Sequence, residues 1–317
     1  MSKLMILMPT SPQRREQVKH CLAHQAPELK WLDWNDEPKI EQLQQVEQVL
    51  AWEPPKNIYA QLPALKWVQS YGAGVDSILA AGPLPENVQL TRVIDGGLNE
   101  RMGQFALAQV LADRFELHDH FGSQQQSQWH RREGHWGNRI GIVGLGSIGQ
   151  ALAKDFNRFG FQVSGWSRTP KRIPGVESLQ GEAGLNQLLE HSDYLINLLP
   201  LTLDTENFFD AKRFAAMSPH SCFINLGRGA QVVDDDLIHA LENHTLRKAV
   251  LDVFRYEPLP DTHPFWSLAS QSTRLILTPH IANISVPERI VALTLNNLQR
   301  LNNQQPLLGL VDPALGY

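Results

Sequence analysis

A chain of 317 residues, of which 42% are hydrophobic and 19% charged, can bury a large core and form about two globular domains. Its formal net charge of -5, with both signs spread along the chain, excludes the basic tract that nucleic acid or an anionic membrane surface requires. Cys21 and Cys222 lie far apart without metal-ligand spacing, and the apolar stretch Leu4 to Met8 is too short for a signal peptide. We therefore expect a cytoplasmic protein with a small-molecule partner, no metal, no nucleic acid and no membrane span.

Short apolar runs alternate with helix-length amphipathic stretches, which is the pattern of a β-α-β protein. The predicted strands are, in chain order, Leu4 to Met8, Trp67 to Ser70, Gln89 to Val93, Ile140 to Val143, Phe161 to Trp166, Tyr194 to Leu199, Cys222 to Leu226, Ala249 to Phe254 and Leu275 to Leu277. Each crossover must pack an apolar stripe back onto the sheet, so this spacing favours parallel sheets covered on both faces. The predicted fold class is α/β.

One long helix is predicted over Asn99 to Phe121, where apolar residues recur at helical spacing. The glutamine-rich stretch Ser123 to Arg139 then interrupts the rhythm and is expected to be an exposed connection. His118, Asp119 and His120 alternate on the helix and so point apart, which favours a solvated helix end over a metal site.

An apolar strand runs directly into the pattern G-x-G-x-x-G at Gly144, Gly146 and Gly149. In a dinucleotide-binding turn the first glycine permits the tight bend, the second lets the backbone approach the pyrophosphate, and the third lets the helix lie close to the strand. Ser147 and Ile148 then begin a helix whose N-terminus can hold phosphate. The alternative, a plain turn, is less favoured because strand, turn and helix complete a β-α-β unit.

The end of the next strand predicts which dinucleotide binds, because a carboxylate there would bind the adenosine ribose and repel a 2′-phosphate. This chain instead has Ser167, Arg168 and Thr169, followed by Lys171 and Arg172. Charge-assisted hydrogen bonds from these cations favour a phosphate, so we predict NADP(H) as the preferred cofactor, with NAD(H) also accepted. A solvated basic turn is the alternative.

Polar side chains follow three further apolar strands, namely Arg228, Glu257 and His280. Loops after the carboxyl ends of parallel strands converge on the ligand crevice, so these distant residues can meet. Reduction of a 2-keto acid needs this set: Arg228 grips the carboxylate and polarises the carbonyl, His280 supplies the proton, and Glu257 favours the imidazolium and orients its ring. Taken singly, each residue has a structural interpretation; their shared location favours catalysis.

These motifs and their order resemble those of the D-isomer-specific 2-hydroxyacid dehydrogenase family. After the Gly-rich turn come Asn225-Leu226-Gly227-Arg228-Gly229, Leu251-Asp252-Val253-Phe254, Glu257-Pro258-Leu259-Pro260 and Thr278-Pro279-His280, and the intervals between the arginine, glutamate and histidine match the family. Within the family the chain is most similar to the bacterial glyoxylate/hydroxypyruvate reductase A type, through Tyr71 to Ile78, Gly165 to Thr169, Ile196 to Pro200 and the closing Gly316-Tyr317.

The resemblance implies two Rossmann-like domains with parallel sheets and an active site in the cleft between them. A flavodoxin-like substrate-binding domain would comprise residues 1–98 plus 285–317, and the dinucleotide-binding domain residues 99–284. The implied reaction is NADPH-dependent reduction of glyoxylate or hydroxypyruvate to glycolate or D-glycerate. A homodimer through the long helix follows by analogy. One departure is the start of that helix at Leu98 to Met102, which lacks the expected glycine, although Gly96 and Gly97 precede it.

The resemblance also assigns roles to residues outside the catalytic set. Backbone groups of Gly72, Ala73 and Gly74 would bind the substrate carboxylate, which a glycine-flanked turn can do because its N–H groups are unobstructed. Trp52 would cover a small substrate pocket, Asp252 would hold the nicotinamide carboxamide, and the Leu199-Pro200 turn would line the dinucleotide. A plain turn and ordinary aromatic packing are the structural alternatives.

Two other functions stay open. A dehydrogenase-like regulator would sense NAD(H) and recruit protein partners, but such proteins usually carry recruiting extensions, and this sequence ends soon after its last predicted helix. A dehydrogenase for another D-2-hydroxy acid, such as NAD-linked phosphoglycerate dehydrogenase, is disfavoured by the Ser167-Arg168 strand end and by the lack of a regulatory domain in the sequence.

Overall fold

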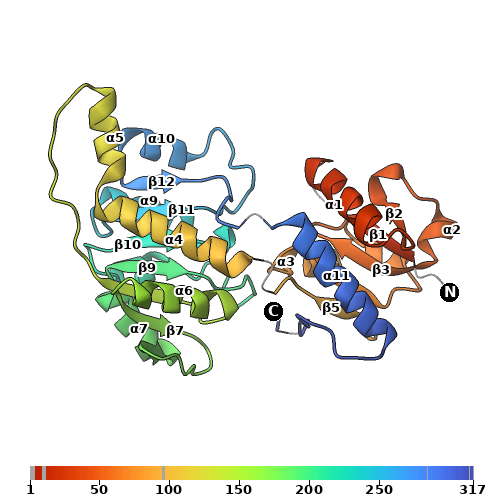
Figure 1. Cartoon of the computed structure of the whole chain (residues 1–317). Helices are drawn as coiled ribbons and strands as arrows, with labels where there is room; N and C mark the ends of the chain where they lie inside the picture. The colour runs from red at the N-terminus through yellow and green to blue at the C-terminus, as the bar shows by residue number, and fades with distance from the viewer. Residues whose placement is uncertain (1–3, 9–11, 95–96, 284, 314, 317) are drawn as a thin grey trace. The chain divides into compact units, whose positions relative to one another are not determined.

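The computed structural model describes residues 4–8, 12–94, 97–283, 285–313 and 315–316, so Gly96 and Tyr317 of the sequence motifs lie outside the described residues. The chain divides into two compact units (Figure 1). Unit 1 comprises Met1–Leu98 and Ser285–Tyr317, and unit 2 comprises Asn99–Ile284. Each unit has its own parallel sheet and its own core.

Unit 1 contains a five-stranded parallel sheet of order β2-β1-β3-β4-β5, which is the flavodoxin-like order. Its strands are β1 (Leu4–Met8), β2 (Lys30–Asp33), β3 (Val46–Ala51), β4 (Trp67–Ser70) and β5 (Gln89–Thr91). Its helices are α1 (Pro12–Gln25), α2 (Ile40–Leu43), α3 (Asp76–Ala80) and α11 (Pro287–Asn302). Met5 and Leu7 of β1 pack towards α1 and α11, whereas Ile6 and Met8 face the opposite core, as the two-residue period of a strand requires.

Unit 2 contains a seven-stranded parallel sheet of order β12-β11-β10-β9-β6-β7-β8. Its strands are β6 (Arg139–Val143), β7 (Gln162–Trp166), β8 (Val176–Leu179), β9 (Tyr194–Asn197), β10 (Cys222–Asn225), β11 (Lys248–Leu251) and β12 (Leu275–Leu277). The order reverses between β6 and β9, which is the switch point of a doubly wound dinucleotide-binding sheet.

Helices cover both faces of the sheet in unit 2, which confirms the predicted α/β class. They are α4 (Leu98–Arg114), α5 (Leu117–Gln125), α6 (Ser147–Arg158), α7 (Gly181–His191), α8 (Ala211–Ala216), α9 (Asp234–Glu242) and α10 (Pro264–Gln271). Helices α4 and α6 contribute to one core with Ile140 and Ile142 of β6, and α7 to α10 contribute to the other with Val143.

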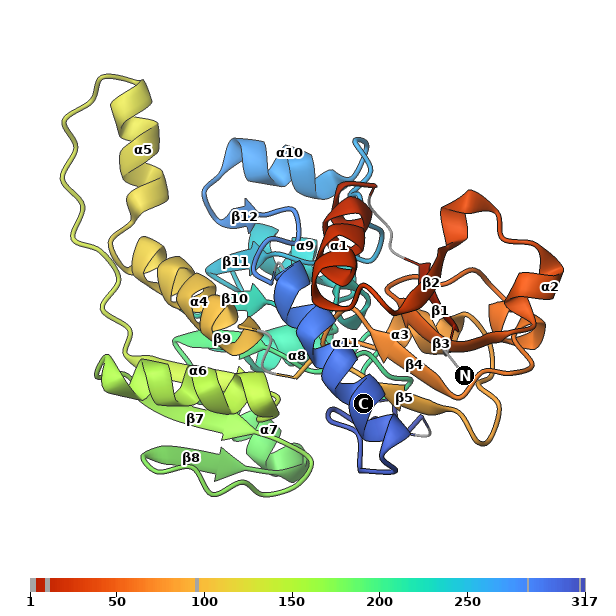
Figure 2. The same cartoon turned by 45° about the vertical axis from the view of Figure 1, so that its right-hand side comes forward.

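The long helix predicted over Asn99 to Phe121 is wrong as a single element. It breaks at Glu116, whose φ of 49° is left-handed, and α5 continues in a new direction. In both views of the chain, α5 and the irregular segment after it project away from the sheet of unit 2 (Figures 1 and 2). Helical spacing predicts the apolar stripe but contains no signal for this break.

Three strands were missed by the sequence pattern, namely β2, β3 and β8. The strand β3 lies at the centre of its sheet, yet Glu47 and Gln48 interrupt its apolar run. Gln48 is fully buried, so tertiary context overrides its polarity. The strands β2 and β8 are each four residues long, and two of the four residues in each are polar, so they are too short to show a period.

Asp119 accepts a hydrogen bond from Thr273 Oγ1 at 2.9 Å, so it has a structural partner. Within the described ranges, no group of three or more His, Cys, Asp or Glu side chains could hold a metal ion. Among the same residues, no helix is both long enough and apolar enough to cross a membrane.

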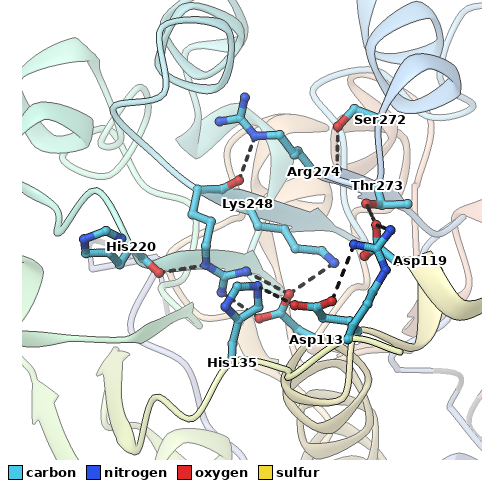
Figure 3. A network of polar contacts seen from close by, with 11 residues as sticks. Asp113, Asp119, His135, His220, Lys248, Ser272, Thr273 and Arg274 are labelled. Carbon is cyan, nitrogen blue, oxygen red and sulfur yellow. Dashed lines mark hydrogen bonds and ion pairs between the residues drawn. The ribbon is translucent and has the colours of Figure 1, made fainter. Parts of the chain in front are cut away.

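A buried carboxylate anchors α4 to the amino ends of the strands of unit 2 (Figure 3). Asp113 accepts hydrogen bonds of 3.0 and 2.6 Å from the guanidinium of Arg247, and Lys248 Nζ lies 3.1 Å from the same carboxylate. Burial opposes ionisation of Asp113, but the hydrogen bonds and charges of Arg247 and Lys248 outweigh it and hold the pKa of this carboxyl below its ordinary value. The group is therefore ionised at neutral pH.

Replacing Asp113 should strongly destabilise unit 2. We expect Asp113→Ala to lower the free energy of unfolding by about 3–5 kcal/mol at pH 7, because two cations would remain buried without their carboxylate. Glu182→Ala, which removes an exposed pair with Lys212, is the control and should change stability by less than about 1 kcal/mol. Because the folded pKa is depressed, the Asp113 contribution should shrink only below about pH 4. Denaturant unfolding at pH 7 and at about pH 3 measures both effects, and equal losses in the two variants would contradict the assignment.

Candidate active site

The Gly-rich turn joins β6 to α6 and has the geometry that a dinucleotide requires. Gly144 has a φ of 108°, which only glycine adopts readily, and its amide donates to Trp166 O at 2.8 Å. A Cβ at Gly149 would lie 2.0 Å from Gly144 O, so this glycine is required for the helix to approach the turn. A Cβ at Gly146 would meet nothing within 4 Å, so that side of the turn is open.

The N-terminus of α6 points its first amides out of the turn. The first intrahelical bond runs from Gln150 N to Gly146 O, so the amides of Ser147, Ile148 and Gly149 precede the hydrogen-bonded ladder. Such amides, together with the helix dipole, bind phosphate. The open side at Gly146 and these donors fit the pyrophosphate of a dinucleotide.

The end of β7 forms a compact turn with exposed cations. Ser167 is buried, its amide donates to Leu179 O at 3.2 Å, and its hydroxyl donates to Thr169 O at 2.7 Å. Arg168 and Arg172 are exposed on this turn. The turn therefore holds the cations at the position where a doubly wound fold binds the adenosine ribose.

Three buried amide side chains connect the strand ends near the turn, and the sequence analysis missed all of them. Asn197, Asn225 and Gln231 are each 0% exposed. Asn197 Nδ2 donates to Asn225 Oδ1 at 2.9 Å and to Gln231 Oε1 at 2.7 Å, while Gln231 Nε2 donates to Leu199 O and Pro200 O. This network holds the Leu199-Pro200 turn in place. Polar residues at the ends of otherwise apolar strands were the available signal.

Arg228 follows β10 and belongs to the same network through its backbone. Its amide donates to Gln231 Oε1 at 2.9 Å, and its carbonyl accepts from Asn225 Nδ2 at 3.2 Å. The guanidinium is half-buried, and its Nη1 donates to Gly227 O at 2.9 Å. A Cβ at Gly229 would lie 1.8 Å from the carbonyl carbon of Phe254, so the arginine loop packs directly on the segment that leads to Glu257.

Glu257 and His280 form a hydrogen-bonded pair, as the catalytic interpretation predicts. His280 Nδ1 and Glu257 Oε2 are 2.7 Å apart, and the other carboxylate oxygen accepts from Phe254 N at 2.9 Å. Burial opposes the charged form of Glu257, but these two hydrogen bonds and the charges of His280 and Arg228 outweigh it and lower the pKa of the carboxyl. An ionised Glu257 accepts the Nδ1 proton, so the ring's Nε2 is available for a ligand.

Asp252 fixes the loop that carries His280. Its carboxylate accepts from Thr278 Oγ1 at 2.6 Å and from the amides of Ile281 and Ala282, both at 2.9 Å. Burial outweighs these bonds and raises the pKa of Asp252. His280 has a φ of 52°, and these bonds hold the backbone on both sides of that left-handed residue. The predicted role of Asp252 towards a carboxamide stays a prediction.

In unit 1, the Gly72-Ala73-Gly74 loop follows β4 beside Trp52. A Cβ at Gly72 would lie 2.0 Å from Trp52 Cζ3, so the indole packs against the glycine. Gly72 N donates to Ser70 Oγ at 3.1 Å, which leaves the amides of Ala73 and Gly74 to carry the predicted carboxylate role. Ser77 Oγ donates to Trp52 O and fixes the backbone of the tryptophan.

Comparison with known proteins supports this assembly of motifs. Residues 107–282 match the family model of the D-isomer specific 2-hydroxyacid dehydrogenase NAD binding domain. The chain therefore belongs to the D-isomer specific 2-hydroxyacid dehydrogenase family, which confirms the resemblance seen in the sequence.

Two relatives and two solved structures show how far the similarity extends. The glyoxylate/hydroxypyruvate reductase A of Serratia proteamaculans is 40% identical over 275 residues, covering 84% of this chain and 87% of the relative. That of Escherichia fergusonii is 36% identical over 308 residues, covering 94% and 95%. An NADPH-dependent glyoxylate/hydroxypyruvate reductase from Sinorhizobium meliloti, in complex with NADP and sulfate, aligns with a TM-score of 0.90 at 31% identity, covering 99% of this chain and 100% of that one. A family member from Xanthobacter autotrophicus Py2, in complex with NADPH and MES, has a TM-score of 0.90 at 33% identity and covers 100% of both chains.

The open side of Gly146 yields a test that separates folding from ligand binding. We expect Gly146→Ala to leave the melting temperature within about 2 °C, because its Cβ would contact nothing in the chain. Its dissociation constant for NADPH, from fluorescence titration, should rise about 10-fold or more, because the methyl group blocks the approach of the pyrophosphate. Gly122→Ala, equally open but on α5, is the control and should bind as the parent does. Unchanged NADPH affinity in Gly146→Ala would remove this turn from the cofactor site.

Proposed function

We propose that this protein reduces small 2-keto acids with NADPH, converting glyoxylate to glycolate and hydroxypyruvate to D-glycerate. The observation that carries the proposal is the 2.7 Å pair of His280 and Glu257 in unit 2. The pair follows strands β11 and β12 of the same parallel sheet in which Gly144 follows β6 and Arg228 follows β10. The relatives named as glyoxylate/hydroxypyruvate reductase A support the choice of substrates.

NADPH is the proposed cofactor, with NADH accepted less well. The exposed Arg168 and Arg172 and the absence of a carboxylate at Ser167-Arg168-Thr169 favour the 2′-phosphate. Two similar structures contain NADPH or NADP, which supports the same choice. When bound, the cofactor supplies the hydride.

The proposed roles of the side chains follow from their hydrogen bonds. His280 donates a proton from Nε2 to the developing alkoxide, while Glu257 accepts the hydrogen bond from Nδ1 and orients the ring. Arg228 binds the substrate carboxylate and polarises the keto oxygen with its planar guanidinium. From unit 1, the amides of Ala73 and Gly74 bind the carboxylate, and Trp52 limits the size of the substrate.

A substrate panel tests the proposal directly. We expect NADPH oxidation, followed at its absorbance maximum, on addition of glyoxylate or hydroxypyruvate, with slower turnover when NADH replaces NADPH. Phosphoglycerate oxidation with NAD should be slower than either, because the basic strand end selects the 2′-phosphate. No turnover with any small 2-keto acid would overturn the enzyme proposal.

Two variants test the proton donor. His280→Ala should keep its affinity for NADPH but lose about 10²–10⁴-fold in kcat, because general acid catalysis contributes that much. An unchanged kcat would exclude His280 as the donor.

Glu257→Gln tests the support of the proton donor. The lowered pKa keeps Glu257 ionised across the neutral range, where its carboxylate accepts the Nδ1 proton of His280. Without that charge-assisted hydrogen bond kcat should fall, while the affinity for NADPH should match that of the parent. An unchanged kcat would show that Glu257 does not support the donor.

We further propose that the protein forms a homodimer in the cytoplasm. Five large apolar side chains on and around α5 are exposed: Phe115, Leu117, Phe121, Trp129 and Trp136. Trp129 is fully exposed, and such clusters mark protein interfaces. Both cysteines are buried free thiols, as in proteins of a reducing compartment.

The dimer proposal is tested by the mass of the protein in solution. Sedimentation of the parent should give twice the chain mass, and the double variant Phe121→Ser with Trp129→Ser should shift it to the monomer. Leu203→Ser, at another exposed apolar side chain, is the control. A monomeric parent would contradict the proposal.

A further inference from the structure

Arg92 is a cation of unit 1 that the sequence analysis overlooked. It follows β5, and its guanidinium Nη1 lies 3.4 Å from Ala73 O in the loop after the neighbouring strand β4. Its own backbone is fixed, since its amide donates to Gly309 O at 2.9 Å. The side chain is half-buried beside the loop proposed to bind the substrate carboxylate.

The hydrogen bonds of this loop leave two amides on one side. Gly72 O accepts from Val93 N at 2.9 Å, Ala73 O accepts from Arg92, and Gly74 O accepts from Ser70 Oγ at 2.8 Å. In a trans peptide, C=O and N–H point in opposite directions. The amides of Ala73 and Gly74 therefore point away from Val93 and Arg92. No partner for either amide lies among the residues that the structure describes. Two consecutive free amides form an anion-binding concavity.

The partial burial of the Arg92 guanidinium also costs free energy. Burial is the cause of the lowered pKa of its guanidinium, and no carboxylate of the described residues forms an ion pair with it. A half-buried cation without an anion beside it costs free energy, so an anion that binds next to Arg92 would be stabilised there. The positive charge lies behind the two amides and adds to their attraction for an anion.

We propose that Arg92 is a positioning residue for the substrate carboxylate: it holds Ala73 O so that the amides of Ala73 and Gly74 face the anion, and it supplies positive charge behind them. The inference rests on the proposed 2-keto acid reductase function and explains how unit 1 recognises the carboxylate shared by these substrates. The proposed role of Arg92 is in substrate binding, whereas Arg228, Glu257 and His280 are proposed to act in the chemical step.

Steady-state kinetics of Arg92→Met and Arg92→Lys test the proposal. In Arg92→Met the KM for glyoxylate should rise about 10-fold or more, while kcat and the KM for NADPH stay within about 2-fold, because the carboxylate is held equally in ground and transition states. Arg92→Lys should lie between Arg92→Met and the parent. The melting temperature of Arg92→Met should be unchanged or higher, since a half-buried cation without a carboxylate partner among the described residues is removed. Arg300→Met is the control, because Arg300 also donates to a backbone carbonyl of unit 1, that of Pro306, and it should match the parent.

Two results would overturn the role of Arg92. One is an unchanged KM in folded Arg92→Met, and the other is a parallel loss of kcat, NADPH affinity and melting temperature, which indicates a general structural role. If the parent itself reduces no keto acid, the proposed function fails instead. Calorimetric titration with oxamate, an unreactive 2-keto acid analogue, then tests Arg92 alone: weaker binding by Arg92→Met than by the parent supports the role, and equal or absent binding overturns it.

Discussion

The proposed chemistry of unit 2 depends on hydrogen-bond partners for the buried backbone groups where the parallel strands end. Peptide groups leaving β9 and β10 are buried, so their hydrogen bonds cannot be left to solvent. Asn197, Asn225 and Gln231 provide the partners and bond to one another. Because Gln231 bonds both the Arg228 amide and the Leu199-Pro200 carbonyls, the proposed substrate-binding arginine and the proposed cofactor turn share one rigid support. A fully satisfied buried network of this kind fixes geometry more than it adds stability.

The two ends of the same strands use charge differently. At the amino end of β11, Lys248 and the preceding Arg247 share the buried carboxylate of Asp113, and this pairing serves folding. At the carboxyl end, Asp252 is satisfied by one hydroxyl and two amides, and it holds the loop of His280. Glu257 is the one carboxylate of the proposed triad, and it is bonded to the histidine. The charges of the proposed site therefore act on orientation and proton transfer, whereas those of the opposite end act on stability.

The sequence predicts the parts of this structure that local pattern determines. The Gly-rich turn, the three polar strand ends and most strands could be found from the sequence. In each of them an apolar run ends at glycine, proline or polar residues. The central strand β3 could not be found, because its buried Gln48 depends on the sheet around it. The break at Glu116 could not be predicted either, because helical spacing contains no signal for a single left-handed residue. Arg92 could not be predicted as a site residue, because a single arginine after a short strand matches no motif. Only its distance from Ala73 O in the structure indicates the proposed role.

Three glycines of unit 2 show how folding constraints can be separated from ligand constraints. Gly149 and Gly229 are each excluded from carrying a side chain by backbone atoms of the chain itself, at 2.0 Å and 1.8 Å. They would be required whether or not a ligand bound. At Gly146 the chain imposes no such limit, and its φ of -71° suits any residue. A glycine that neither backbone conformation nor packing requires, at the N-terminus of a helix, is explained by a partner that approaches from outside. The same logic applies to Arg92, which is half-buried and has no carboxylate partner among the described residues.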